Sequence, residues 1–338
     1  MMSINPKLNT LQKNSLDLNT MSKGIQDGDP TMLSRAITLI ESSKNGDKVL
    51  ANQLLNKLPK TNAKTYRIGI TGNPGVGKSS LIEKLGIQYI NNGHKVAVIA
   101  YDPSSLRSGG SILGDKTRME KLSQRKEAFI RPSPSSGNLG GVGVNTEKLV
   151  FLFEAAGYDR IIIETVGVGQ NETLIENFVD CFVLIALPGA GDEIQVIKRG
   201  IIERTDILAV NKADGDQVNL AKIALGFYKN VLHLFPRNDK WIVPSTAISA
   251  QENSGINDLI ELIEKFYRHQ LIKGALEHNR KEQLEKNFDK NWKSEILNEL
   301  VNKKTFQTVL KKLKKEILEG TTTPEEAIVS LKNRVLKN

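Results

Sequence analysis

Hydrophobic and polar positions follow different patterns in different parts of the chain. Between about residues 65 and 270, short and almost continuous apolar runs alternate with helical stretches. Such runs predict strands that are covered on both faces, and the helices between them predict the crossover connections that parallel strands require. We therefore expect an α/β domain with a mostly parallel central sheet flanked by helices.

The predicted strands are the apolar runs in this central region, and the glycine- and serine-rich stretches between them predict loops. Long loops in a compact domain are often functional. The loops cover residues 104–114 and 132–143. The strands are Tyr66–Thr71, Val96–Tyr101, Arg160–Glu164, Phe182–Ala186, Ile207–Val210 and Trp241–Ser245.

Both ends of the chain carry a helical pattern instead. Pro30 suits a first helical turn, and apolar residues follow it at helical spacing. A second amphipathic stretch covers Val49–Leu58, and only helical patterns appear from about residue 271. We predict an N-terminal helical extension at 1–62, a central domain at 63–270 and a C-terminal helical region at 271–338.

The first predicted strand ends in Gly72-Asn-Pro-Gly-Val-Gly-Lys-Ser79, which matches the phosphate-binding P-loop pattern. Its glycines allow a tight turn whose amide N–H groups point at one anion, and the helix that follows adds its positive dipole end. We expect Lys78 to bridge the terminal phosphates and the Ser79 hydroxyl to bind Mg²⁺. The alternative is a glycine-rich turn that binds no ligand. The strand before the motif and the helix after it favour the phosphate-binding loop, because an empty turn would not require them. The predicted nucleotide-binding residues here are Gly72, Asn73, Gly75, Val76, Gly77, Lys78, Ser79 and Ser80.

A second motif, Asn211-Lys-Ala-Asp214, directly follows the strand Ile207–Val210. The Asp214 carboxylate can accept both donor protons of guanine, a pair that adenine lacks. Charge-assisted hydrogen bonds contribute about 1.5–3 kcal/mol each, so two of them would discriminate by roughly 10² to 10⁴. The same tetrad also occurs at helix starts, but its position after a strand and a P-loop favours guanine recognition.

The other residues around the base have smaller predicted roles. We expect Asn211 to tie the loop to the phosphate loop and the stem of Lys212 to cover the base plane. Ser249 and Ala250 follow the last predicted strand, where a backbone amide would meet the guanine oxygen. GTP and GDP are thus the predicted ligands.

Three acidic residues stand where they could reach a magnesium ion beside Ser79. Asp102 and Glu164 come at strand ends, and Asp115 follows a glycine-rich stretch. Mg²⁺ prefers oxygen ligands and keeps several waters, so the carboxylates can act directly or through water. A solvated loop carboxylate or a helix cap is the alternative for each of them. Gly167 occupies the position whose N–H would contact the γ-phosphate.

The predicted catalytic residues are Lys78, Asp115 and Glu164. No glutamine directly follows Gly167, where related enzymes orient the attacking water, and Gln170 lies further along. We therefore expect slow intrinsic GTP hydrolysis, at about 10⁻⁴ to 10⁻² s⁻¹, with stimulation by a partner or a second subunit.

Composition narrows the location and the classes of partner. The chain is 39% hydrophobic and 25% charged, and no run approaches the roughly 18 apolar residues that a membrane span needs. The formal charge of +9 includes lysines that interleave with apolar residues in Val309–Leu318, which indicates a solvated helix face. Aromatic interleaving is absent, so we do not expect nucleic acid as a partner. Because the sequence offers neither a membrane span nor the apolar core of a secretory signal, we expect no membrane partner and place the protein in the cytoplasm. The lone Cys181 lies in an apolar run and is expected to be buried.

Several motifs together resemble one family. They are residues 72–80, 101–105, 109–119, 164–170, 188–195 and 211–214. In these segments the chain is similar to the MeaB family, the GTPase chaperones of methylmalonyl-CoA mutase. Proteins similar to this family also carry an older label, ArgK-type transport-system kinase. The resemblance spans roughly residues 25–270.

The resemblance implies more than the residues show by themselves. It implies a homodimer joined by C-terminal helices, and a slowly hydrolysing GTPase that gates cobalamin loading and protects a B12-dependent acyl-CoA mutase. It maps the Mg²⁺ ligands onto Ser79, Asp102, Asp115 and Glu164. It also assigns residues 189–198 to a third switch that communicates with the mutase.

Two other functions compete with this one. An ArgK-type kinase or ATPase of an amino-acid transport system would use ATP, which the guanine preference expected from Asp214 disfavours. A metallochaperone GTPase for nickel usually needs clustered Cys and His ligands. The histidines of this chain are scattered, and they are His94, His233, His269 and His278.

Overall fold

The computed structural model describes residues 17–42, 44–59, 64–102, 119–134, 139–165, 175–189, 199–237 and 239–335. The chain divides into two compact units, Met1–Gln283 and Leu284–Asn338. The domain boundaries expected from sequence, after residues 62 and 270, stay predictions.

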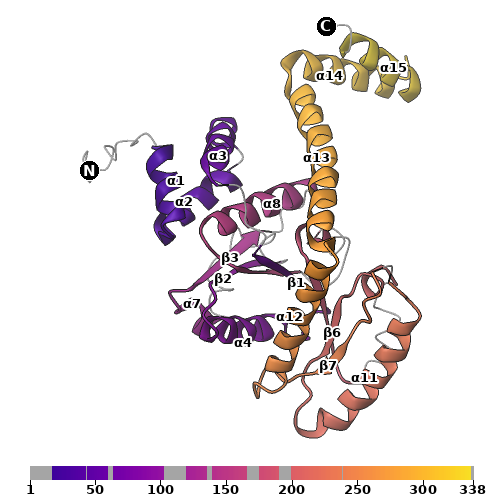
Figure 1. Cartoon of the computed structure of the whole chain (residues 1–338). Coiled ribbons are helices and arrows are strands. Elements are labelled where there is room, and N and C mark those ends of the chain that lie inside the picture. The colour runs from indigo at the N-terminus through magenta and orange to yellow at the C-terminus, as the bar shows by residue number, and fades with distance from the viewer. Residues whose placement is uncertain are drawn as a thin grey trace, which may run out of the picture. The chain divides into compact units, whose positions relative to one another are not determined.

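The larger unit is built on a parallel sheet, which confirms the predicted α/β class (Figure 1). In the described residues the sheet has seven strands in the order β3-β2-β4-β1-β5-β6-β7, and each printed pairing is parallel. The strands are β1 Tyr66–Gly72, β2 Val96–Asp102, β3 Ala128–Pro134, β4 Arg160–Glu164, β5 Cys181–Ala186, β6 Ile207–Val210 and β7 Ser245–Ala247.

Two parts of the strand prediction were wrong. The sequence analysis missed β3, an edge strand whose two prolines are tolerated because one side of the strand has no ladder to complete. The last strand is Ser245–Ala247 rather than Trp241–Ser245. Trp241 instead packs in the preceding loop, where its indole N–H donates to the Asp206 carbonyl at 2.9 Å.

The helices of the larger unit lie on both faces of the sheet. They are α1 Leu18–Gln26, α2 Pro30–Glu41, α3 Asn45–Lys57, α4 Lys78–Asn91, α7 Glu120–Ser123, α8 Leu139–Ala155, α10 Arg199–Ile202, α11 Val218–His233 and α12 Ile256–Ile272, with short 3₁₀ turns η2 Glu176–Phe178 and η4 Gly215–Gln217. The loop predicted at 132–143 was partly wrong, because α8 begins at Leu139. Buried Leu149, Leu152 and Phe153 hold α8 against the sheet despite its glycine-rich start.

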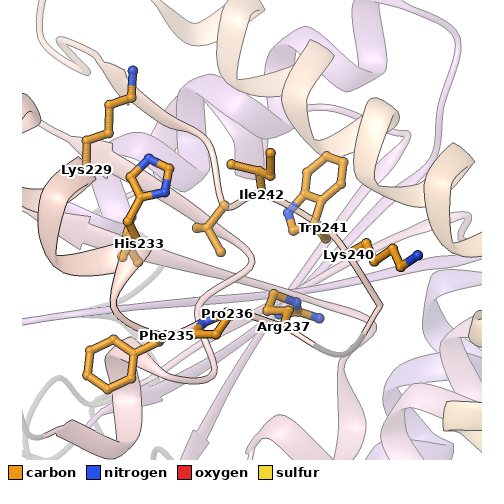
Figure 2. A pocket seen from close by; sticks show the side chains of 10 residues that line it. Lys229, His233, Phe235, Pro236, Arg237, Lys240, Trp241 and Ile242 are labelled. Atoms are coloured by element: carbon orange, nitrogen blue, oxygen red, sulfur yellow. The ribbon is translucent and has the colours of Figure 1, made fainter.

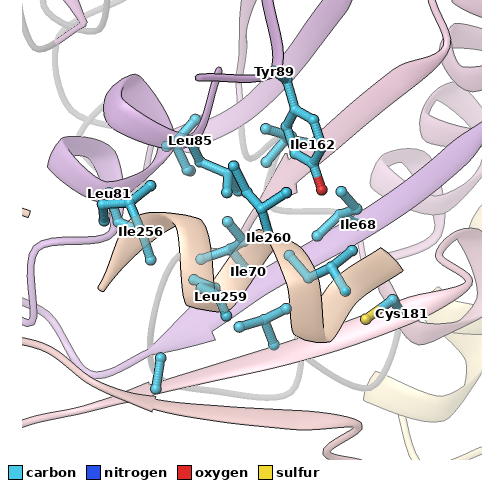
Figure 3. Close-up of a cluster of buried hydrophobic side chains, with 14 of the residues drawn as sticks. Ile68, Ile70, Leu81, Leu85, Tyr89, Ile162, Cys181, Ile256, Leu259 and Ile260 are labelled. Carbon is cyan, nitrogen blue, oxygen red and sulfur yellow. The ribbon is translucent and has the colours of Figure 1, made fainter. Parts of the chain in front are cut away.

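One face of the sheet packs against α4 and α12 (Figure 3). Leu81 and Leu85 of α4 meet Leu259 and Ile260 of α12 over the buried strand residues of β1. Cys181, at the start of β5, belongs to this cluster and is buried, as the sequence predicted. This packing fixes the start of α4, and with it the segment between β1 and α4.

The opposite face is covered by the N-terminal helices and α8. Asp29 caps α2 by accepting from the Thr31 and Met32 N–H groups, and Pro30 occupies the first turn. Leu33, Ile37 and Ile40 are buried, which confirms the helical spacing expected there. The sequence analysis did not predict α1, whose Met21 and Ile25 join the same cluster.

The C-terminal part is helical, as predicted. It contains α13 Ala275–Asn302, α14 Lys304–Leu318 and α15 Pro324–Val335. The first turns of α13 belong to the larger unit, where the Arg280 guanidinium donates to both carboxylate oxygens of Asp180 at 2.8 and 2.6 Å. Within the ranges given above, no helix is both long and apolar enough to cross a membrane.

Candidate nucleotide-binding site

The predicted site residues meet at one edge of the sheet, beyond the carboxyl ends of the strands. β1 lies at the centre and pairs with β4 on one side and β5 on the other. Its carboxyl end therefore lies at a topological switch point, the usual place for a ligand in an open α/β sheet. Gly72 ends β1, Glu164 ends the neighbouring β4, and Asn211 follows the end of β6.

The phosphate loop has a backbone that requires glycine at two positions. Gly72 has φ +152°, and a Cβ there would lie 2.4 Å from the Ile185 carbonyl oxygen. Gly77 has φ +90°, and a Cβ there would lie 2.6 Å from Asn211 Nδ2. Side chains at these positions would therefore push the loop away from β5 and from the loop after β6.

Lys78 is the first residue of α4, and its side chain folds back across the phosphate loop. Its Nζ donates to the carbonyl oxygens of Gly72 at 2.8 Å and Asn73 at 3.2 Å. The residue is buried. A buried ammonium at a helix N-terminus, beside a loop of positive-φ glycines, is the charge arrangement that a polyphosphate requires.

Ser79 and Glu164 supply oxygen atoms next to this cradle. The Ser79 hydroxyl donates to Glu164 Oε1 at 2.9 Å, and the Glu164 side chain is buried. A hydroxyl and a carboxylate in contact beside a phosphate loop fit the oxygen preference of Mg²⁺. These two residues are therefore the described side chains that could hold the ion.

The other predicted metal and phosphate ligands are described only in part. Asp102 is the last residue of β2. Two residues before it, Ala100 pairs with Glu164, so this strand end lies beside that of β4. The Asp102 side chain lies outside the described residues, as do Asp115, Gly167 and residues 190–198 of the expected third switch.

Asn211 connects the phosphate loop to the two loops that are predicted to surround the base, residues 211–214 and 249–250 (the base loops). Its amide Nδ2 donates to the Val76 carbonyl at 2.7 Å, and its Oδ1 accepts from the Ala250 N–H at 3.0 Å. The residue is buried, so both bonds lie away from solvent. One side chain thus fixes the spacing between the phosphate end and the base end of the site.

Asp214 and Ser249 form the far end of the site. The Ser249 hydroxyl donates to Asp214 Oδ2 and accepts from the Glu252 N–H at 3.0 Å. The two loops are also joined by the Ala213 N–H, which donates to the Ile248 carbonyl at 3.0 Å. Lys212 is exposed with φ +61°, which turns the chain sharply between Asn211 and Asp214. The Asp214 carboxylate is thereby held in place at the mouth of the loop.

A buried pair of threonines was missed by the sequence analysis. The Thr165 hydroxyl donates to Thr71 Oγ1 at 2.9 Å, and the Thr165 N–H donates to the Ile70 carbonyl at 3.0 Å. Thr71 precedes the phosphate loop and Thr165 follows Glu164, so the pair joins the two strand ends that carry these motifs. The sequence offered one signal for this pair, because Thr71 directly precedes Gly72 and Thr165 directly follows Glu164.

Comparisons with known proteins agree on one family. The model of the family described as "Methylmalonyl Co-A mutase-associated GTPase MeaB" matches residues 33–305. The chain is 40% identical over 308 residues to "GTPase ArgK" of Escherichia coli K12, covering 91% of this chain and 93% of that protein. It is 38% identical over 320 residues to "Methylmalonic aciduria type A homolog, mitochondrial" of Mus musculus, covering 90% and 76%.

A solved structure is similar over nearly the whole chain. It is the crystal structure named "LAO/AO transport system kinase", with a TM-score of 0.72 and 32% identity. The alignment covers 99% of this chain and 100% of that one.

Proposed function

This chain belongs to the MeaB family of methylmalonyl-CoA mutase-associated GTPases, and we propose from that premise that it is a GTP-switched chaperone of a B12-dependent acyl-CoA mutase. The family is described as a GTPase family, and the Escherichia coli relative is named a GTPase. The observation that carries the guanine part of the proposal is the Asn211 clamp, which holds the phosphate loop and the Asp214 loop at a fixed spacing.

Each end of the site has its own task in GTP binding. The phosphate-loop amides and the Lys78 ammonium hold the triphosphate, while the Asp214 carboxylate accepts from the guanine. Ser79 and Glu164 are the described residues that would hold Mg²⁺, together with Asp102 and Asp115 in the proposed set. When bound there, the ion would neutralise phosphate charge. Hydrolysis is proposed to be slow, and Lys78, Asp115 and Glu164 are its proposed catalytic residues.

The proposal extends to the assembly and its place in the cell. The exposed apolar residues of α13 support a homodimer, because a helix that is stable alone in water would not keep so many on its surface. They are Leu284, Phe288, Trp292, Ile296 and Leu297. The cytoplasm is the proposed location.

The competing function is an ArgK-type kinase of a transport system. A relative bears the name ArgK, and the similar solved structure is named as a transport system kinase. A kinase of that type would transfer phosphate from ATP. The Asp214 carboxylate favours guanine because adenine leaves its oxygens facing no donor pair.

A nucleotide-binding measurement separates the two functions. Calorimetry with Mg²⁺ should show GTP and GDP binding at least about 100-fold tighter than ATP and ADP. Asp214→Asn should move the preference from GTP toward xanthosine triphosphate, because the amide donates to the xanthine oxygen. The control is Asp216→Asn, an exposed carboxylate two residues further on, which should keep the GTP preference. Equal affinity of the unaltered protein for ATP and GTP would refute the guanine site.

A second measurement tests the mutase part. A purified B12-dependent acyl-CoA mutase should lose activity more slowly during turnover when this protein and GTP are added. The same protein with Lys78→Ala, which removes the phosphate-loop ammonium, should give little protection. If the mutase is inactivated at the same rate with and without the GTP-bound protein, the chaperone role fails while the GTPase remains.

A further inference from the structure

A cavity lies away from the nucleotide site, towards the amino ends of the strands. It has a volume of about 340 Å³ and is formed by the end of α11 and the loop that leads to β7 (Figure 2). Because α11 starts beside the Asp214 loop and runs back along the sheet, its last turn lies near the amino ends of the strands. The volume is in the range of small-molecule sites.

The floor and walls of this cavity are largely apolar. Leu232 of α11 and Trp241 are buried, and Phe235, Pro236 and Val243 add further apolar surface. Ile242 also lines it with 75% of its surface exposed. An isoleucine so open to water beside a cavity offers surface that a bound apolar group would cover.

The charged residues that line the cavity are all cationic, and no carboxylate is among the lining residues. They are Lys229, Arg237 and Lys240. In Figure 2, Lys229 and Lys240 lie on opposite sides of the group. Within the described ranges, no ion pair is found for either lysine. Both lysines on the rim thus lack an acidic partner among the described residues.

Arg237 differs from the lysines because its guanidinium is already hydrogen-bonded to two carboxylates. Its Nη1 donates to Asp206 Oδ1 at 2.5 Å, and its Nη2 and Nε donate to the Asp239 carboxylate at 3.0 and 3.1 Å. Asp239 also accepts from the Trp241 N–H at 3.0 Å and from Gln270 Nε2 at 3.0 Å. This network fixes the loop that carries Lys240, Trp241 and Ile242, so the cavity is formed before any ligand binds.

Lys240 has an additional feature. Its φ is +59°, a conformation that is uncommon for a residue with a side chain. The Lys240 N–H donates to the Arg237 carbonyl at 3.2 Å, so the turn is held by the same framework. The strained turn keeps the lysine at the rim rather than leaving it on a free loop.

We propose that this cavity is a binding site for a small organic anion that joins a carboxylate or phosphate head to an apolar body. One of the two rim lysines, Lys229 or Lys240, would bind the head, and the Leu232, Trp241 and Ile242 surface would cover the body. Both halves of the ligand are needed, because a free inorganic anion gains nothing from the floor and a neutral apolar molecule gains nothing from the rim. The site is separate from the nucleotide site and does not depend on the proposed chaperone role.

The test uses the full-length protein saturated with GDP and Mg²⁺, so that the phosphate loop is occupied. Calorimetry is run with octanoate, octyl phosphate, 1-octanol and inorganic phosphate. Octanoate, octyl phosphate or both should bind with a stoichiometry of one per chain. The one that binds more tightly shows whether the site prefers a carboxylate or a phosphate head. Octanol and inorganic phosphate should bind at least about ten-fold more weakly.

The variants locate the binding. The double variant Lys229→Gln and Lys240→Gln should weaken the anion by about ten-fold or more. The control removes two exposed lysines outside the cavity, Lys222→Gln on α11 and Lys281→Gln on α13, and should bind as the unaltered protein does. The proposal is overturned if neither anion binds, if octanol binds as tightly as octanoate, or if the two double variants behave alike.

Discussion

Asn211 shows how one side chain can set the geometry of a whole site. Its amide donates to the phosphate loop at Val76 and accepts from the base loop at Ala250. Each bond contributes about 1 kcal/mol to stability, but leaving the buried partners unsatisfied costs more. Asn211 also explains the glycine at position 77, because its Nδ2 occupies the space that a Cβ would need.

The first prediction compares two glycines of the phosphate loop. Gly75→Ala and Gly77→Ala both place a side chain at positive φ, but only the Cβ at 77 meets another atom, Asn211 Nδ2 at 2.6 Å. Without nucleotide, we expect Gly77→Ala to lower the free energy of unfolding by about 1–3 kcal/mol more than Gly75→Ala does. Chemical denaturation in urea measures this difference. Equal losses would mean that the Asn211 contact does not restrict position 77.

At the scale of elements, the start of β6 depends on a buried carboxylate. Asp206 accepts from the Phe182 N–H at 2.7 Å and from Arg237, which ties β5, β6 and the loop before β7 together. Burial raises the pKa of Asp206 to about 7, against the opposing effect of Arg237. Asp239, which holds the other side of Arg237, has its pKa lowered to about 2: burial opposes that shift, and the hydrogen bonds from Arg237 and the Trp241 N–H outweigh it.

The second prediction follows from the pKa of Asp206. Below the unfolded pKa of about 4, both states are protonated, and between about 4 and 7 the folded state keeps a proton that the unfolded chain releases. The stability due to this proton is therefore lost as the pH rises toward 7. Asp206→Asn has no such proton, so the stability advantage of the unaltered protein over this variant should shrink by about 2 kcal/mol between pH 5 and 7. Denaturant unfolding at each pH measures it, and a constant difference would contradict the raised pKa.

At the scale of the molecule, the two compact units carry different kinds of surface. The larger unit buries its apolar residues in three clusters around the sheet. In the unit Leu284–Asn338, α14 and α15 pack on each other, and Leu313 and Ala327 are buried there. Five apolar residues of α13, between Leu284 and Leu297, stay exposed in the single chain, and they are the basis of the proposed homodimer.

The third prediction tests that homodimer. Phe288→Glu with Trp292→Glu should shift the protein from dimer to monomer, because charges would replace the aromatic side chains that a partner is expected to cover. Light scattering after size-exclusion chromatography gives the mass. The matched control is Ile223→Glu with Phe227→Glu, two exposed apolar residues of α11 in the larger unit, and it should remain dimeric. Dissociation by the control alone would place the interface on α11 instead.

The sequence by itself determined the parallel α/β class and the motifs that mark the site. Both kinds of signal can be found in a short stretch of sequence. A continuous apolar run such as Ile207–Val210 indicates a strand that is buried on both faces. A glycine pattern such as Gly72–Gly77 indicates a backbone turn that other residues rarely adopt. The sequence analysis missed the edge strand β3, because its prolines do not follow the usual pattern of a strand and neighbouring elements stabilise it. It also misplaced β7, because Trp241 is held in the preceding loop by a hydrogen bond to Asp206 rather than in a strand.

Only the tertiary structure decided which residues meet. Thr71 and Thr165 stand 94 positions apart, and Asn211 and Val76 stand 135 apart, yet each pair shares a hydrogen bond. The lysine-rimmed cavity likewise depends on Arg237 being held by Asp206, which lies 31 positions earlier in the chain. Sequence spacing carries no information on such contacts, because they are set by how helices and strands pack.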